Sequence, residues 1–94
     1  MPQLNHKVKP DPDVVCTELG NKEAVLLHLK TKMYYSLNET GLRIWQLLND
    51  GLTLNEISER LQQEFDVTPE KARESVMNLI NELIAEKLVE VVDE

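Results

Sequence analysis

Residues 34–48 run a short aromatic strand directly into a capped amphipathic helix, and this junction limits the folds open to the chain. Aromatic residues favour a strand that ends at Leu37. Asn38 follows at once, and its side chain can accept a hydrogen bond from a backbone N–H of a first helical turn. Apolar side chains then recur at helical spacing. We therefore expect a strand over residues 32–37 and a helix that ends before Gly51.

Two further strands are expected ahead of this junction. β-Branched residues dominate residues 14–19, and a second apolar run covers residues 23–29 after a Gly-Asn turn signal. A turn near residues 30–31 then leads into the third strand. The three strands form an antiparallel meander in which the third strand lies at an edge. Cys16, the one cysteine of the chain, is expected to be half-buried in the first strand.

Two more helices follow, and both carry clear start signals. Thr53 and Glu56 have the spacing of a capping box. Thr68, followed by a proline, opens a third helix that is expected to reach Lys87. Residues 88–92 are apolar apart from Glu90 and suit a short final strand. The order of elements predicts an α+β, winged helix-turn-helix-like fold, with a three-stranded antiparallel sheet followed by three helices.

Length and proline positions predict one domain preceded by an arm. A chain of 94 residues forms one small core. Pro10 and Pro12 lack the N–H that a β-ladder uses, so residues 1–12 are expected to form a flexible arm and residues 13–94 a single domain. The chain shows no signal-peptide pattern and no membrane-length apolar run, and it has a single cysteine. These features favour the cytoplasm.

Charge is unevenly distributed along the chain. Of the formal net charge of -7, residues 1–37 contribute +1 and residues 38–94 contribute -8. DNA binding relies on Lys and Arg side chains that neutralise phosphates, and a winged-helix regulator would place its third helix in the DNA groove. Because that helix is acidic here, the charge opposes the alternative of a winged-helix DNA-binding regulator. We expect no nucleic-acid partner and no membrane partner.

The residue types needed for catalysis are not grouped in the sequence. His6 and His28 have no second His or Cys at ligand spacing, and the three glycines form no phosphate-binding loop. We therefore expect no enzyme activity, no metal site and no cofactor, and we interpret the chain as a binding module. A structural subunit that self-associates through its edge strand is a further alternative.

The expected third helix has a wider apolar surface than a single core stripe needs. Ala72, Val76, Leu79 and Leu83 gather on one side and form the predicted core stripe. Met77, Ile80 and Ile84 extend this surface past one flank, with Arg73 and Asn81 beside them. Two interpretations stay open. The helix is buried on several sides, or these residues form the wall of a groove, where flexible Met77 would adapt to varied apolar ligands.

The junction resembles the signature of PqqD-like proteins, the small domains called RiPP recognition elements. Such domains hold the leader of a ribosomally made precursor peptide for a modifying enzyme. Leu37, Asn38, Gly41 and Trp45 match the strand-to-helix pattern of the family, in which Asn38 and Gly41 are structural. The resemblance covers residues 25–92. It implies a non-catalytic role in the biosynthesis of pyrroloquinoline quinone (PQQ) or of another modified peptide.

The resemblance also implies where the peptide binds. The leader is expected to lie as an added strand between the third strand and the third helix, by β-augmentation. Arg73, together with Lys30 and Lys32, would favour an acidic leader. The expected partners are the leader peptide and a modifying enzyme such as a radical-SAM protein or a leader protease. The implied peptide-binding residues are Lys32, Met33, Tyr34, Tyr35, Ser36, Leu37, Arg73, Met77, Ile80, Asn81 and Ile84.

Overall fold

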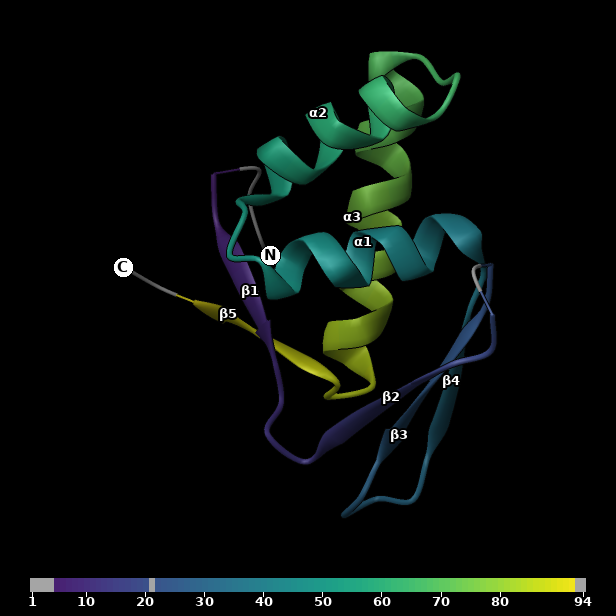
Figure 1. Cartoon of the computed structure of the whole chain (residues 1–94). Helices are drawn as coiled ribbons and strands as arrows, with labels where there is room; N and C mark the ends of the chain where they lie inside the picture. The colour runs from purple at the N-terminus through teal and green to yellow at the C-terminus, as the bar shows by residue number, and fades with distance from the viewer. Residues whose placement is uncertain (1–4, 21, 93–94) are drawn as a thin grey trace.

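The elements follow the predicted order of a sheet and then helices (Figure 1). The computed structural model describes residues 5–20 and 22–92. They form strands β1 (Lys7–Pro10), β2 (Val14–Glu18), β3 (Ala24–His28) and β4 (Tyr34–Leu37), helices α1 (Glu39–Asn49), α2 (Leu54–Glu64) and α3 (Pro69–Ala85), and strand β5 (Val89–Val92). Strands β2, β3 and β4 pair in that order as an antiparallel sheet. The predicted α+β fold, with a three-stranded sheet followed by three helices, is confirmed.

Each helix begins at the capping residue that the sequence predicted. The Asn38 side chain accepts a hydrogen bond of 2.8 Å from the backbone N–H three residues later. Thr53 and Glu56 form both halves of a capping box, and Thr68 accepts a bond of 3.2 Å from the Lys71 N–H. These bonds satisfy N–H groups that have no partner within the helix. Within the described residues, no helix is long and apolar enough to cross a membrane.

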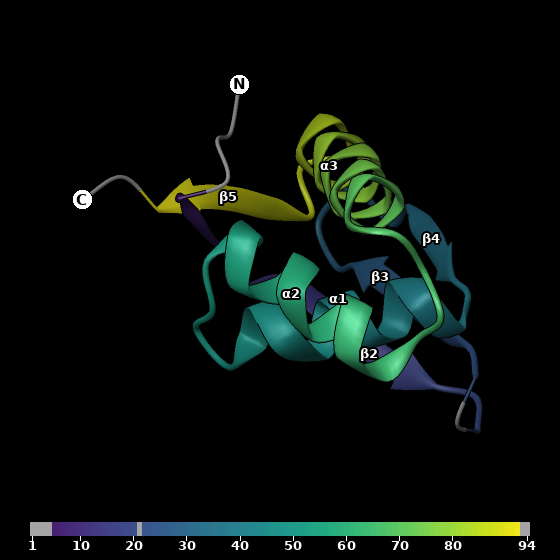
Figure 2. The ribbon, with the colours of Figure 1, turned by 90° about the horizontal axis from the view of Figure 1, so that it is seen from above.

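The core lies between the inner face of the sheet and the three helices. Alternation along β3 buries Ala24, Leu26 and His28. Trp45 of α1 is 6% exposed and belongs to the core, and Cys16 of β2 is half-buried as expected. Figure 2 shows α3 next to β4, on the side where the sheet ends. The edge position predicted for the third strand is therefore confirmed, with α3 as its neighbour.

Strand β1 corrects the predicted N-terminal arm. Lys7–Pro10 pair antiparallel with β5, with Val8 opposite Val91, and Val8 is 2% exposed. The prediction of a flexible arm over residues 1–12 is therefore wrong for this strand, while residues 1–4 lie outside the described part of the chain. A two-stranded ladder leaves every second N–H pointing outward, so a proline at the end of β1 is tolerated. Within the expected final strand over residues 88–92, Val89–Val92 form β5, which pairs with β1 and not with the three-stranded sheet.

Replacing Val8 with Ala should lower the free energy of unfolding by about 2 kcal/mol, because two methyl groups are lost where β1 meets the core. Chemical denaturation followed by circular dichroism measures the change. The matched control is Val15→Ala, at a side chain that is 45% exposed, and its effect should stay below about 0.5 kcal/mol. Equal and small effects of both changes would show that β1 does not stabilise the domain.

Candidate functional site

Strand β4 has one hydrogen-bonded neighbour among the described residues, so its other edge is open. The His28 N–H donates to the Met33 carbonyl at 3.0 Å. In an antiparallel ladder this bond turns the backbone groups of Met33, and of every second residue after it, toward β3. The N–H and C=O groups of Tyr34 and Ser36 then point to the open edge. β4 thus presents two residues whose backbone can pair with another chain.

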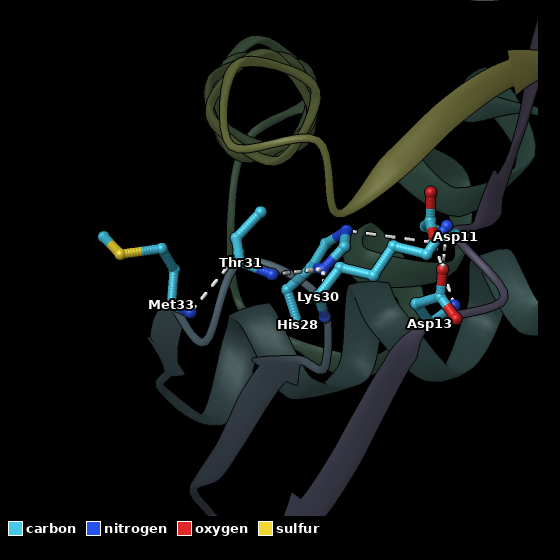
Figure 3. Close-up of polar contacts among 6 residues, drawn as sticks. All are labelled: Asp11, Asp13, His28, Lys30, Thr31 and Met33. Atoms are coloured by element: carbon cyan, nitrogen blue, oxygen red, sulfur yellow. Dashed lines mark hydrogen bonds and ion pairs between the residues drawn. The ribbon is translucent and has the colours of Figure 1, made fainter.

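His28 holds the turn that positions the start of β4 (Figure 3). Its buried ring accepts hydrogen bonds at Nδ1 from the backbone N–H groups of Lys30 and Thr31, at 3.2 and 3.4 Å. In the neutral ring the proton therefore lies on Nε2. The Asp11 Oδ1 is 3.9 Å from that nitrogen. These contacts tie the turn to β3 and to the segment before β2.

Lys32 and Met33 precede β4, so the predicted strand over residues 32–37 is two residues too long. Lys32 has a φ of 64°, which is left-handed and does not occur in an extended strand. Its N–H donates to the His28 carbonyl at 2.8 Å and closes the turn. Lys30, expected to give a basic spot beside the strand, has its ammonium 3.2 Å from an Asp13 carboxylate oxygen.

A pocket of about 640 Å³ opens where the end of β4, the start of α1 and one face of α3 meet. Apolar lining comes from Leu19, Leu37, Ile44 and Leu79, and α3 also contributes Ser75, Asn78 and Glu82. The β4 residues in the lining are Tyr35, Ser36 and Leu37. The structure therefore joins the open strand edge and α3 in one site.

Gly41 lets α1 begin close to the end of β4. A Cβ atom at this position would lie 3.3 Å from both the Asn38 Oδ1 and the Leu37 Cδ2. All three residues line the pocket. A larger side chain at Gly41 would push against the cap of α1 and against the core side chain of β4, so the glycine keeps the corner of the pocket open.

Tyr35 links β4 to α3. Its hydroxyl donates a hydrogen bond to the Glu82 carboxylate. Partial burial, this bond and the negative charges of Glu82 and Glu86 raise the pKa of Tyr35 to about 12. The phenol is therefore protonated at neutral pH and can donate its hydrogen bond to the Glu82 side chain.

The face of α3 that lines the pocket differs from the face that the sequence assigned to a groove. Leu79, predicted for the core stripe, is half-buried and lines the pocket. Ile80, predicted for the groove, is 0% exposed and belongs to the core. Met77 lies about 160° around the helix from Leu79, on the opposite flank of the buried stripe. Arg73, Asn81 and Ile84 lie on the Met77 flank and are not among the residues that line the pocket.

Sequence reasoning missed the pocket residues of α3 and of the β2–β3 hairpin. Leu79 and Glu82 are three residues apart and share a helix face. That spacing relates them to each other, but it carries no sign that the face meets a strand. Leu19 and Glu23 flank a turn and had no pattern that pointed to a site. Within the described residues, no three His, Cys, Asp or Glu side chains gather as a metal ion would require.

The chain belongs to the PqqD family. The family model described as coenzyme PQQ synthesis protein D (PqqD) matches residues 23–89, which is more than half of the chain. The matched region contains β3, β4 and all three helices, and therefore most of the pocket. No curated protein matches the chain.

Two solved structures are similar to this chain over nearly their whole lengths. One is described as TbiB1 in complex with the TbiA(beta) leader peptide. It is 30% identical, with a TM-score of 0.83, and the match covers 92% of this chain and 99% of that chain. The other is described as lasso peptide synthetase B1 complexed with the leader peptide. It is 23% identical, with a TM-score of 0.81 and coverage of 89% and 98%, and it shares the fold.

The phenol of Tyr35 should titrate near the raised pKa of about 12. In a Tyr34→Phe variant, Tyr35 is the one tyrosine left, and near-ultraviolet absorbance reports its ionisation. Because the folded state holds this proton more tightly, the free energy of unfolding should fall as pH rises from the ordinary pKa of 10.0 toward the folded value. Adding Glu82→Gln should lower the midpoint. A titration midpoint of Tyr35 at the ordinary pKa of 10.0, with Glu82 intact, would contradict the hydrogen bond between Tyr35 and Glu82.

Proposed function

We propose that this protein binds the leader segment of a ribosomally made precursor peptide as an added strand on β4, next to α3. The observation that carries the proposal is the open edge of β4 beside a pocket on α3, in a chain of the PqqD family. Two structures of the same fold are described as complexes with leader peptides, which supports the same class of ligand here.

Binding would combine main-chain pairing with selection by the pocket. The free N–H and C=O groups of Tyr34 and Ser36 would pair with the leader backbone, and each hydrogen bond contributes about 1 kcal/mol net. These bonds do not read the leader sequence. Every second leader residue would face α3, because side chains alternate along a strand. Leu19 and Leu79 would offer those residues apolar contacts.

The charge of α3 argues against the alternative of a winged-helix DNA-binding regulator. This helix carries Glu70, Glu74 and Glu82 against Lys71 and Arg73. A DNA duplex would meet net repulsion where a recognition helix needs cations. The two similar solved structures are described as complexes with leader peptides and not with DNA.

Replacing Ser36 with Pro should weaken leader binding at least roughly tenfold, about 1.4 kcal/mol. Proline removes the N–H that faces the open edge and keeps the pairing with β3, since edge strands tolerate proline. Ser36→Ala retains the N–H and is the matched control, with an affinity expected within about twofold of the unmodified protein.

Fluorescence anisotropy with a labelled leader peptide measures both affinities, and circular dichroism checks that both variants are folded. The labelled peptide is a leader segment that the unmodified protein binds with measurable affinity. Equal affinities for the two variants would reject strand addition at β4. An equal loss of affinity in both variants would instead assign the contact to the hydroxyl, which both changes remove.

We also infer that the bound leader is presented to a modifying enzyme, such as a radical-SAM protein or a leader protease. A binding module of this kind acts by raising the effective concentration of substrate and not by catalysis. The protein should therefore accelerate modification at low precursor concentration, and the benefit should fade at saturation. Initial rates measured with and without the protein test this. Equal rates at low precursor concentration would reject the delivery role.

A further inference from the structure

The charged residues along the groove are acidic. Among the described residues that line the pocket, the charged ones are Glu23, just before β3, and Glu82 of α3. Glu86, which caps the C-terminus of α3, adds a negative charge near the phenol of Tyr35. Arg73, the cation expected beside the strand, lies on the other flank of α3, with its guanidinium 3.9 Å from a Glu70 oxygen. A peptide bound on β4 would therefore lie beside the negatively charged side chains of these glutamates.

Glu82 keeps acceptor capacity for a ligand. Its Oε2 accepts the hydrogen bond from Tyr35, and a carboxylate has a second oxygen and further lone pairs. The residue is exposed. A Lys or Arg of a bound peptide would make a charge-assisted hydrogen bond here, whereas an Asp or Glu would face like charges.

Two apolar side chains, Leu79 and Leu19, line the pocket together with Glu82, at a spacing that suits an extended peptide. Leu79 precedes Glu82 by three residues, about 4.5 Å along the helix axis. Leu19, 55% exposed, lines the same pocket from the β2–β3 hairpin. In a strand, residues i and i+2 share a face and lie about 6.6 Å apart. Two such side chains would reach the apolar contact and the carboxylate together.

We propose that the leader recognised by this chain carries an apolar residue that packs against Leu19 and Leu79 and, two residues away on the same face, a Lys or Arg that pairs with Glu82. The inference rests on the proposed function and adds the charge and spacing of the ligand. The expected charge of the leader is therefore basic and not acidic, as Arg73 had suggested from the sequence, because Arg73 does not line the pocket. Lys32 stands before β4, at the end away from the pocket.

A selection from random displayed peptides on the purified full-length chain tests the proposal without a known precursor. Enriched peptides should share an apolar residue and a basic residue separated by one position. Enrichment of acidic residues there, or of no charge at all, would overturn the inference and leave peptide binding standing. Recovery of no binding peptide would overturn the proposed function as well, so the two failures are distinguishable.

Affinities of a selected peptide for two matched variants locate the contact. Glu82→Gln removes the charge and keeps an oxygen that can accept from Tyr35, and it should weaken the basic peptide roughly three- to fivefold. Glu74→Gln removes an exposed charge from the same helix outside the pocket and should leave affinity unchanged. Equal losses of affinity in both variants would indicate a long-range effect of the net charge of α3 and would reject a direct ion pair with Glu82.

A second peptide, with Leu in place of the basic residue, provides the complementary control. Its affinity should be the same for the unmodified protein and for Glu82→Gln, because it has no charge to pair. Thermal unfolding of each variant shows that the fold is retained. An affinity of the Leu peptide that falls with Glu82→Gln would show that the change damages the pocket, and would overturn the ion-pair assignment.

Discussion

Strand β4 ends at Leu37 and helix α1 begins at Glu39, with only Asn38 between them. The Asn38 side chain accepts a hydrogen bond from the Gly41 N–H and so caps the helix. The chain can turn this sharply because a glycine at position 41 leaves no Cβ against Leu37 and Asn38. The sheet and the first helix therefore meet at a corner, and the pocket opens at that corner. The residues that join the sheet to the first helix, Leu37, Asn38 and Gly41, therefore also line the candidate site.

An open strand edge is a risk as well as a binding surface, because unpaired N–H and C=O groups can pair with any extended chain. Here β4 is short, with four residues, and the turn anchored by His28 fixes where it begins. α3 lies beside the edge and is joined to it through Tyr35 and Glu82. The edge is thus available to a chain that fits the space beside α3. Because Glu23 and Glu82 line the pocket, a chain with basic side chains at this place would be favoured.

Much of the fold could be predicted from the sequence because its signals are local. Caps at Asn38, Thr53 and Thr68 depend on residues within one helical turn, and strand alternation depends on near neighbours. Strand β1 could not be found this way. Pro10 at its end and Pro12 shortly after it argue against a ladder, and its partner β5 lies far away along the chain, so only long-range pairing reveals it.

By itself, the sequence determined strands β2, β3 and β4, the three helices, their order and the edge position of β4, since these depend on patterns of residues close together in the chain. Only the tertiary structure decided which flank of α3 meets β4. Both flanks carry apolar residues, Leu79 on one and Met77 on the other, and helical periodicity does not rank them. The packing of α3 against α2 and the core makes the choice. It places Glu82, and not Arg73, at the groove, because rotation of a helix about its axis is set by contacts between elements.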